Sequence, residues 1–189
     1  MDPSRHNNRI FTTDEAEELQ LESCEFEDCT FIGCDFARRD VRDATFRGCR
    51  FERCNFSMVK FGETIVRDAV FVGCKLTGAD FSGERDFTTF RFEDCLLDYV
   101  IFQKLRIKKT CFLRCSLTDA DFSGADLFAA QFLECELGGA LFAQTNLEGA
   151  DFRTANGFAI DPERNRLRKA QFTLNGVLGL VQKYGIIVE

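Results

Sequence analysis

The chain has 189 residues, a formal net charge of −7 and 22 Phe beside two Tyr and no Trp. A net negative charge argues against binding through a basic surface, so we expect no direct contact with nucleic acid. No apolar run approaches the length of a membrane span and the first residues lack a signal-peptide pattern, so we expect a cytoplasmic protein that does not contact a membrane. Repeated use of one large apolar side chain indicates a repeat domain.

Residues 1–20 show no regular apolar spacing and are expected to form an N-terminal cap. An uncovered end of a repeat domain would expose unpaired strand edges, which favour aggregation. Within this segment, Ile10 and Phe11 are predicted to form a short strand over the first repeat.

From Leu21 to Phe81 a large apolar residue recurs every five positions, and after a shift of one residue the series continues from Phe87 to Phe152. A period of five fits neither an α-helix nor a single β-strand. The residue two positions before each large one is usually Cys or Ala. One large and one small apolar side chain per unit predict a chain that turns a corner at every unit and fills a narrow interior. We therefore assign residues 21–156 to a repeat domain.

The cysteines give the size of one coil independently. Six of them recur at intervals of four repeat units, with one extra residue between Cys74 and Cys95: Cys34, Cys54, Cys74, Cys95, Cys115 and Cys135. Coils of four units, with one residue inserted near position 85, would stack all six on one face. Stacked residues hold their Cβ atoms ~4.8 Å apart, beyond the ~3.8 Å that a disulfide prefers, and they do not converge as zinc ligands must. We expect reduced core thiols, with no metal and no cofactor.

Two places depart from the repeat. Arg39 stands where a small residue is expected, and Arg85 and Phe90 do so beside the inserted residue. Residues 83–91 are expected to form an irregular, protruding corner. This corner is either a tolerated packing defect or a contact loop of Glu84, Arg85, Asp86 and Phe90, since loops on rigid scaffolds often carry recognition.

An acidic surface is the second candidate site for a partner. Assigning the units to sides gives Glu63, Asp80 and Asp121 on one side and Asp98 and Asp119 on the adjoining side. Such a column can imitate the phosphates of duplex DNA, which carries one charge per ~1.7 Å of axis. The alternative is a surface that only favours solubility. Arg42, Lys60 and Lys104 interrupt the acidic side.

Residues 157–189 form a separate C-terminal segment. Leu174, Val177, Leu178 and Val181 fall at i, i+3, i+4 and i+7 and predict an amphipathic helix, with Thr173 as its N-cap and Gly185 at its end. Residues 186–188 are expected to form a closing strand. The apolar residues exceed what the capping of one rod end requires, so we predict a homodimer interface of Leu174, Val177, Leu178, Leu180, Val181, Tyr184 and Ile186.

No catalytic residues are predicted. His6 is the only histidine, no glycine-rich phosphate loop is present, and the carboxylates recur as outward turn residues. We expect a protein that is not an enzyme.

The sequences ADFSG at 79–83 and 120–124 resemble the A-[DN]-[LF]-x-x signature of the pentapeptide-repeat family. The resemblance covers roughly residues 21–156. It implies an all-β fold, a right-handed four-sided parallel β-helix, here followed by a short C-terminal α-helix.

The C-terminal segment carries a narrower resemblance. The sequences DPERN at 161–165, AQF at 170–172 and YGIIV at 184–188 resemble the ending of Qnr-type proteins, especially the albicidin-resistance and microcin-immunity members. That resemblance implies a cytosolic homodimer, joined through its C-terminal helices, that binds bacterial type II topoisomerases: DNA gyrase, with topoisomerase IV as a related target. It would act as a DNA-mimicking rod that protects the enzyme from a poison, for antibiotic resistance or self-immunity. The alternative is a scaffold or regulatory protein with a partner other than a topoisomerase.

Overall fold

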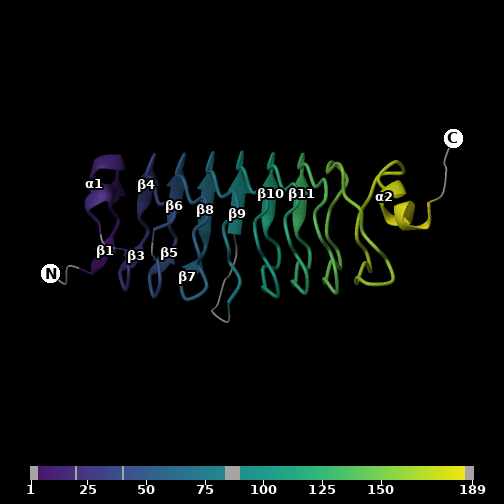
Figure 1. The fold of residues 1–189 in the computed structure, drawn as a ribbon, viewed down its shortest axis with the longest axis horizontal. Coiled ribbons are helices and arrows are strands. Elements are labelled where there is room, and N and C mark those ends of the chain that lie inside the picture. The colour runs from purple at the N-terminus through teal and green to yellow at the C-terminus, as the bar shows by residue number, and fades with distance from the viewer. Residues whose placement is uncertain (1–3, 20, 40, 84–89, 186–189) are drawn as a thin grey trace.

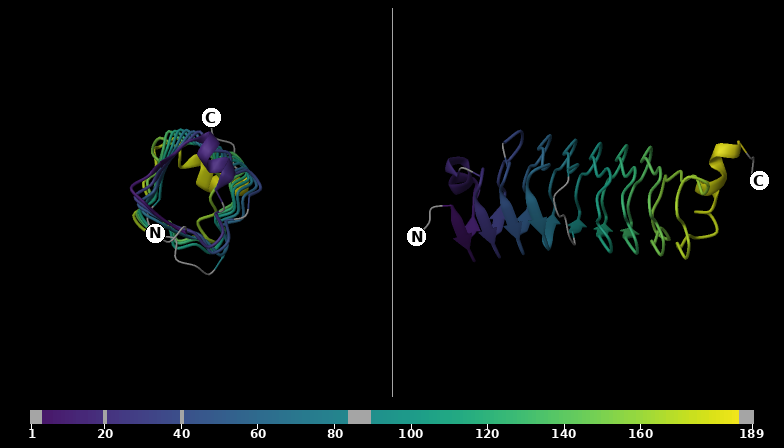
Figure 2. Two further views of the ribbon diagram at one scale, coloured as in Figure 1. Left: turned by 90° about the vertical axis from the view of Figure 1, so that its left-hand side faces the viewer. Right: turned by 90° about the horizontal axis from the view of Figure 1, so that it is seen from below.

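The computed structural model describes residues 4–19, 21–39, 41–83 and 90–185. These residues form a rod of stacked coils, with the two ends of the chain at opposite ends of the rod (Figure 1). Seen along the rod, the coils superimpose as a four-sided outline (Figure 2). The four-sided parallel β-helix expected from the repeat is therefore confirmed.

Short strands and a few helical turns make up the regular structure of the described residues. In chain order they are β1 (Arg5–Asn7), β2 (Ile10–Phe11), α1 (Thr13–Glu18), β3 (Glu25–Glu27), β4 (Thr30–Ile32), β5 (Thr45–Arg47), β6 (Arg50–Glu52), β7 (Ile65–Arg67), β8 (Ala69–Val72), β9 (Phe90–Glu93), β10 (Cys111–Leu113), β11 (Gln131–Leu133), α2 (Leu178–Val181) and the 3₁₀ turn η1 (Gln182–Tyr184). Within this part of the chain, no helix combines the length and apolar character needed to cross a membrane.

Parallel pairing between successive coils builds the sides of the rod. One side is a sheet in the order β1-β3-β5-β7, and a second is a sheet in the order β11-β10-β9-β8-β6-β4-β2. Phe31 pairs with Phe51 and Phe51 with Phe71, each time four repeat units further along the chain. Phe71 pairs with Phe92, one residue beyond that spacing. The predicted coil of four units and the single inserted residue are both confirmed.

Stacked phenylalanine rings fill the interior. The ring of Phe112 lies 5.3 Å from that of Phe92 and 5.0 Å from that of Phe132, nearly parallel to both. The same ring meets Phe122 edge to face at 6.0 Å. Each such pair contributes about 0.5–1.5 kcal/mol beyond the burial of its area. The reuse of one residue type thus follows from a core in which every layer has the same shape.

The six cysteines that recur once per coil form one inward ladder, as predicted. The thiol of Cys74 donates to the Phe51 carbonyl at 3.4 Å and that of Cys95 donates to the Phe71 carbonyl at 3.4 Å, so both occupy the same position in consecutive coils. The hydrogen bond to the Cys54 thiol and burial raise the pKa of Cys74. On another face, burial raises the pKa of Cys49 to about 12. None of the ten cysteines forms a disulfide, and all but Cys111 are buried.

Each corner of the coil is a tight turn. The Phe122 carbonyl accepts a hydrogen bond from the Ala125 N–H at 3.0 Å, and the residue before Ala125, Gly124, has φ +70°. The equivalent Ala129 has φ +56° without being glycine. A positive φ favours Gly, Asn and Asp, which occupy many of these corner positions, although Met58 and Tyr99 adopt it as well.

The N-terminal residues join the coil stack in register. The predicted strand at Ile10 and Phe11 is observed as β2, which pairs with β4. β1 pairs with β3, and the ring of His6 stacks on that of Phe26 at 5.0 Å. His6 and Phe11 thus occupy two central positions of the five-residue repeat, which the sequence pattern does not reveal because one of the two side chains is polar.

The C-terminal helix is shorter than its apolar spacing suggests. α2 spans Leu178–Val181, and the residues before it form turns with hydrogen bonds between residues three apart, such as the Gly179 N–H to the Gly176 carbonyl at 3.1 Å. Two glycines in this stretch explain the difference, because each costs roughly 1 kcal/mol in a helix relative to alanine. Thr173 still caps the first turn, since its Oγ1 accepts from the Gly176 N–H at 3.0 Å. The closing strand expected at 186–188 lies outside the described residues.

Candidate partner-binding surfaces

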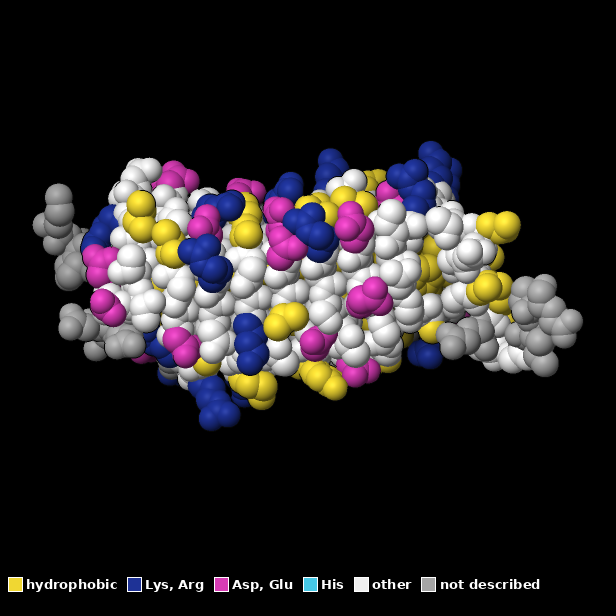
Figure 3. Space-filling model, turned by 90° about the horizontal axis from the view of Figure 1, so that it is seen from above, with side chains coloured by type: hydrophobic (Ala, Val, Ile, Leu, Met, Phe, Trp, Pro, Cys, Tyr) yellow, Lys and Arg dark blue, Asp and Glu magenta, His cyan; other side chains and the backbone are white. Residues whose placement is uncertain are grey.

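The two aspartates Asp80 and Asp121 lie in one column along the rod, which we call the Asp80 side. It consists of residues that bridge from coil to coil: Lys60, Asp80, Ile101, Asp121 and Leu141. A basic residue and two apolar residues therefore alternate with the two carboxylates. On the face drawn in Figure 3, acidic and basic side chains are likewise interspersed. The surface offers separate negative points instead of an unbroken acidic column.

Both aspartates also support the fold. The Asp80 carboxylate accepts hydrogen bonds from the Ser82 N–H at 2.8 Å and the Ser82 hydroxyl at 2.5 Å. The Asp121 carboxylate accepts from the Ser123 N–H at 2.8 Å and from the Gln103 amide at 2.5 Å. Burial opposes ionisation of Asp121, but these hydrogen bonds outweigh it and lower the pKa. The acidic position of the repeat therefore stabilises the turn at the corner and also contributes surface charge.

The remaining acidic candidates differ in whether their carboxylates take part in hydrogen bonds within the protein. Asp98 accepts from the Ser116 hydroxyl at 2.5 Å and from the Thr118 N–H at 3.1 Å in the next coil. Glu63 and Asp119 are exposed and form no ion pair with any residue that the structure describes. These two carboxylates are the best placed for a partner.

The irregular corner is only partly described. Glu84, Arg85 and Asp86 lie outside the described residues. Phe90 differs from its prediction as a contact residue, because its side chain is 1% exposed and its ring contacts those of Phe81 and Phe92 at 5.7 and 5.5 Å. An inward aromatic side chain at the position of a small residue is a core residue here, so Phe90 itself cannot meet a partner.

A basic hollow was not foreseen from the sequence. It has a volume of about 320 Å³ and is lined by Arg38, Arg39, Arg42, Met58 and Lys60. Arg39 replaces the small inward residue, and its guanidinium donates to the Leu19 carbonyl and lies 5.9 Å above the Phe36 ring. In the sequence, Arg39 indicated an irregularity in the repeat. It did not indicate that Met58 and Lys60 of the next coil lie beside it.

At the C-terminal end, several predicted interface residues are exposed. Leu174 is 88% exposed, and Val177, Leu178 and Tyr184 are also exposed. Leu180 packs against the core and Val181 is half-buried, so these two contribute less to a free surface. Ile186 lies outside the described residues. The exposed residues form an apolar end of the rod.

Ion pairs and hydrogen bonds attach this end to the 161–165 loop. Lys183 Nζ lies 2.5 Å from Asp161 Oδ1 and 2.9 Å from Glu163 Oε2, and the Tyr184 hydroxyl donates to Glu163 at 2.6 Å. The Lys183 ammonium lowers the pKa of Asp161, and the Tyr184 hydroxyl and Lys183 lower that of Glu163. Two parts of the sequence that carried the narrower resemblance are thus in contact.

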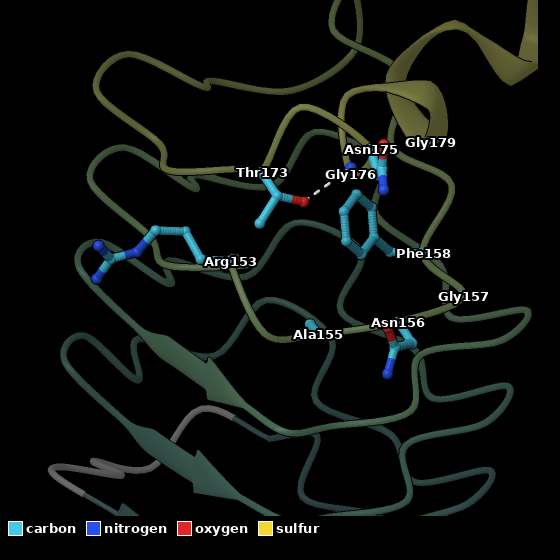
Figure 4. Close-up of a pocket in the computed structure, with 9 residues that line it drawn as sticks. All are labelled: Arg153, Ala155, Asn156, Gly157, Phe158, Thr173, Asn175, Gly176 and Gly179. Atoms are coloured by element: carbon cyan, nitrogen blue, oxygen red, sulfur yellow. Dashed lines mark hydrogen bonds between the residues drawn. The ribbon is translucent and has the colours of Figure 1, made fainter. Parts of the chain in front are cut away.

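A second hollow of about 320 Å³ lies beneath the terminal turns (Figure 4). Its polar residues are largely committed to the fold. Arg153 points away from Phe158 and Asn175 and forms hydrogen bonds to both carboxylate oxygens of Asp151 at 3.0 and 2.8 Å. A Cβ on Gly179 would lie 2.4 Å from the Phe158 carbonyl, so the terminal turn packs directly on the last coil.

Among the described residues, no group of three or more His, Cys, Asp or Glu side chains is arranged to hold a metal ion. The site features are therefore a rod with scattered exposed carboxylates, one basic hollow and an apolar C-terminal end. This combination is that of a repeat protein with several distinct exposed surfaces.

The comparisons with known proteins agree with this class. A family model described as a pentapeptide repeat region matches residues 19–102, and one described as pentapeptide repeats (8 copies) matches residues 135–157, together more than half of the chain. The chain belongs to the pentapeptide-repeat family. No curated protein matches it significantly.

Solved structures of the same fold cover almost the whole chain. Full-length QnrB1, a plasmid-mediated fluoroquinolone resistance protein, matches with a TM-score of 0.58 and 16% identity, over 96% of this chain and 100% of that chain. HetL of the cyanobacterium Nostoc sp. strain PCC 7120, involved in the regulation of heterocyst differentiation, matches with a TM-score of 0.57 and 17% identity, over 88% and 81%. At these identities the likeness establishes the fold.

Proposed function

We propose that this protein binds a bacterial type II topoisomerase, DNA gyrase in the first place and topoisomerase IV as a related target, and protects it from a poison. It does so in the cytoplasm as a rod that imitates duplex DNA, without catalysing a reaction and without binding DNA itself. The biological outcome is antibiotic resistance or self-immunity. The observation that carries the proposal is the match to a resistance protein, QnrB1, over that protein's entire length.

The charge pattern supports engagement at discrete points. Asp80 and Asp121 lie two coils apart on the Asp80 side, which corresponds to about 9.6 Å at the spacing of neighbouring strands. Glu63 and Asp119 add two exposed carboxylates. A basic groove built for duplex DNA would attract such a surface over a distance of about one Debye length, roughly 8–10 Å in physiological salt.

Binding to purified gyrase at several salt concentrations tests this proposal. A variant carrying Glu63→Gln, Asp80→Asn and Asp121→Asn removes three charges and keeps the turns, because Asn55 accepts the equivalent bond from the Ser57 N–H at 3.1 Å. We expect weaker binding and a flatter salt dependence, since fewer charges attract the enzyme.

A control variant carries Glu27→Gln and Asp126→Asn on another side of the rod and removes two charges. Asp126 bridges Arg106 and Asn146 and accepts from the Phe128 N–H at 3.3 Å, so it occupies the same kind of turn. Gyrase binding by this control should equal that of the wild-type protein. Equal binding by all three proteins would contradict the role of the acidic side.

A homodimer joined through the C-terminal segment completes the proposal. The exposed Leu174, Val177, Leu178 and Tyr184 support it, because burial of apolar surface drives association. A two-fold arrangement would cover the same end of both rods.

A second candidate function is that of a scaffold or regulatory protein with another partner. The match to HetL, with a TM-score almost equal to that of QnrB1, favours this alternative. A folded, monodisperse protein that does not bind gyrase or topoisomerase IV would leave this candidate standing.

A further inference from the structure

The basic hollow gathers four cationic side chains on a protein whose net charge is −7. The fold brings them together from two coils: Arg38, Arg39 and Arg42 lie in one coil, and Lys60 with Met58 lies in the next, where the Arg38 N–H donates to the Ser57 carbonyl at 3.3 Å. Unit charges 4 Å apart repel one another by about 1 kcal/mol in water and by more near a protein surface. Such a cluster attracts anions.

Two of the cations, Arg38 and Lys60, are not used in ion pairs within the described part of the protein. Arg38 and Lys60 are exposed and form no ion pair with any residue in the described ranges. The backbones of Lys60 and Asp80 form a β-bridge between neighbouring coils. The Asp80 carboxylate accepts hydrogen bonds from the N–H and the hydroxyl of Ser82. The Lys60 ammonium forms no ion pair with this neighbouring carboxylate.

The other two cations are Arg39, which is held in place by the protein, and Arg42. Arg39 is half-buried, bound to the Leu19 carbonyl and placed over the Phe36 ring. Arg42 lies 3.9 Å from Glu22, and both side chains are more than half exposed, so this pair is weak. A guanidinium fixed as that of Arg39 is binds an anion at a lower entropic cost than a mobile side chain does.

The walls of the hollow select the kind of anion. Guanidinium groups donate in a planar fork that matches phosphate oxygens, and Lys adds a point charge. Met58 supplies a flexible apolar wall, 59% exposed, beside the cations. The volume of about 320 Å³ lies at the lower end of ligand pockets, roughly 300–1,000 Å³.

We propose that this hollow is a binding site for a small organic phosphate, one with adjacent phosphoryl groups and a less polar remainder. Arg38, Arg42 and Lys60 contact the phosphoryl oxygens, and Met58 packs against the remainder of the ligand. Arg39 adds a positive charge that the protein holds in place. A long nucleic acid is disfavoured as the source of the phosphate, because the net charge of the protein, −7, repels an extended polyanion. The hollow adjoins the Asp80 side through Lys60, but its proposed ligand is different, so titration with small phosphates tests it without gyrase.

Isothermal titration with inorganic pyrophosphate, ADP and a short DNA duplex tests the proposal. We expect binding of pyrophosphate and tighter binding of ADP, both weakened by salt, and no binding of the duplex through the same residues. The variant Arg38→Gln with Lys60→Gln should lose at least about tenfold in affinity for both small ligands, since each removes a charge-assisted hydrogen bond. Met58→Ala should weaken ADP binding and leave pyrophosphate binding unchanged.

The matched control is Arg53→Gln with Lys75→Gln. Arg53 is an exposed corner residue with φ +52°, as Arg38 is with φ +59°, and Lys75 bridges neighbouring coils as Lys60 does. This control should bind both ligands as the wild-type protein does. The proposal is overturned if the wild-type protein binds neither small ligand, if the control loses affinity equally, or if duplex DNA displaces ADP from the hollow.

Discussion

At the scale of single residues, the aspartate before each central apolar residue has two roles. Its carboxylate accepts a hydrogen bond from the N–H two residues later, as Asp121 does from Ser123 at 2.8 Å, and it also charges the surface. Asn146 accepts the same kind of bond from Glu148 at 3.2 Å without a charge. The two roles can therefore be separated by substitution.

Asp121→Ala should destabilise the protein by about 0.5–1.5 kcal/mol, because the Ser123 and Gln103 donors lose their acceptor. Asp121→Asn should cost clearly less, since the amide oxygen keeps the turn bond. The free energy of unfolding in urea measures both. Equal losses would mean that the charge, and not the acceptor, stabilises the corner.

Central phenylalanines should be the most sensitive positions. Phe112 is 0% exposed, and Phe112→Ala is expected to cost about 3–5 kcal/mol through lost burial and a cavity. Phe128→Ala is the control, because Phe128 is 41% exposed and should lose far less. Chemical denaturation compares the two; a loss under about 1 kcal/mol at Phe112 would contradict its place in the core.

At the scale of elements, the repeat was predictable and the two ends were only partly so. The spacing of Phe and Cys determines the register because every coil presents the same inward positions. At the N-terminal end, His6 hides a central position, although it stacks in the core. At the C-terminal end, an apolar period of 3.6 suggests a longer helix than forms, because Gly176 and Gly179 favour turns.

The candidate site was predictable only for single residues at positions that the repeat directs outward. Glu63 and Asp119 follow directly from that register. Phe90 does not, since a large side chain at a small position can turn inward as well as outward. The basic hollow needs residues from two coils, which a linear pattern does not bring together.

The attachment of the C-terminal segment should depend on pH. The folded pKa values of Asp161 and Glu163 are lowered, so their contribution to stability is present above the unfolded values, about 3.9 and 4.3, and is lost as the pH falls through the folded values. Hydrogen-exchange protection of α2 should therefore fall on acidification while the coils stay protected.

Lys183→Met should weaken this pH dependence and lower the protection of α2 at neutral pH, because both ion pairs are lost while the Tyr184 hydrogen bond to Glu163 remains. Arg166→Met, which removes the ion pair to Glu148 within the coils, is the control and should leave α2 unchanged. Unchanged protection in Lys183→Met would show that packing alone holds the segment.

The apolar C-terminal end should decide the oligomeric state. Leu174→Lys with Leu178→Lys places charges on exposed positions, so folding should be retained while association is lost. Sedimentation velocity should show a dimer for the wild-type protein and a monomer for the variant. A wild-type monomer, or a variant dimer, would place the interface elsewhere or remove it.

At the scale of the whole molecule, a rigid rod of repeated coils separates its surfaces along its length. The basic hollow lies toward the N-terminal end, the exposed carboxylates lie along the sides, and the apolar residues lie at the C-terminal end. Under the proposed function, a large partner contacts the sides of the rod and a second copy contacts its C-terminal end. The mixed charge of the sides favours a specific fit over general attraction to basic surfaces.

The most direct test of the account is a supercoiling assay with purified gyrase, relaxed plasmid and a poison that traps the cleaved-DNA complex. The protein should restore supercoiling in proportion to its concentration, and the Glu63→Gln, Asp80→Asn, Asp121→Asn variant should need a higher concentration than the Glu27→Gln, Asp126→Asn control. Supercoiling that stays blocked at a large excess of folded protein, with every poison class and with topoisomerase IV decatenation equally unprotected, would contradict the proposed function.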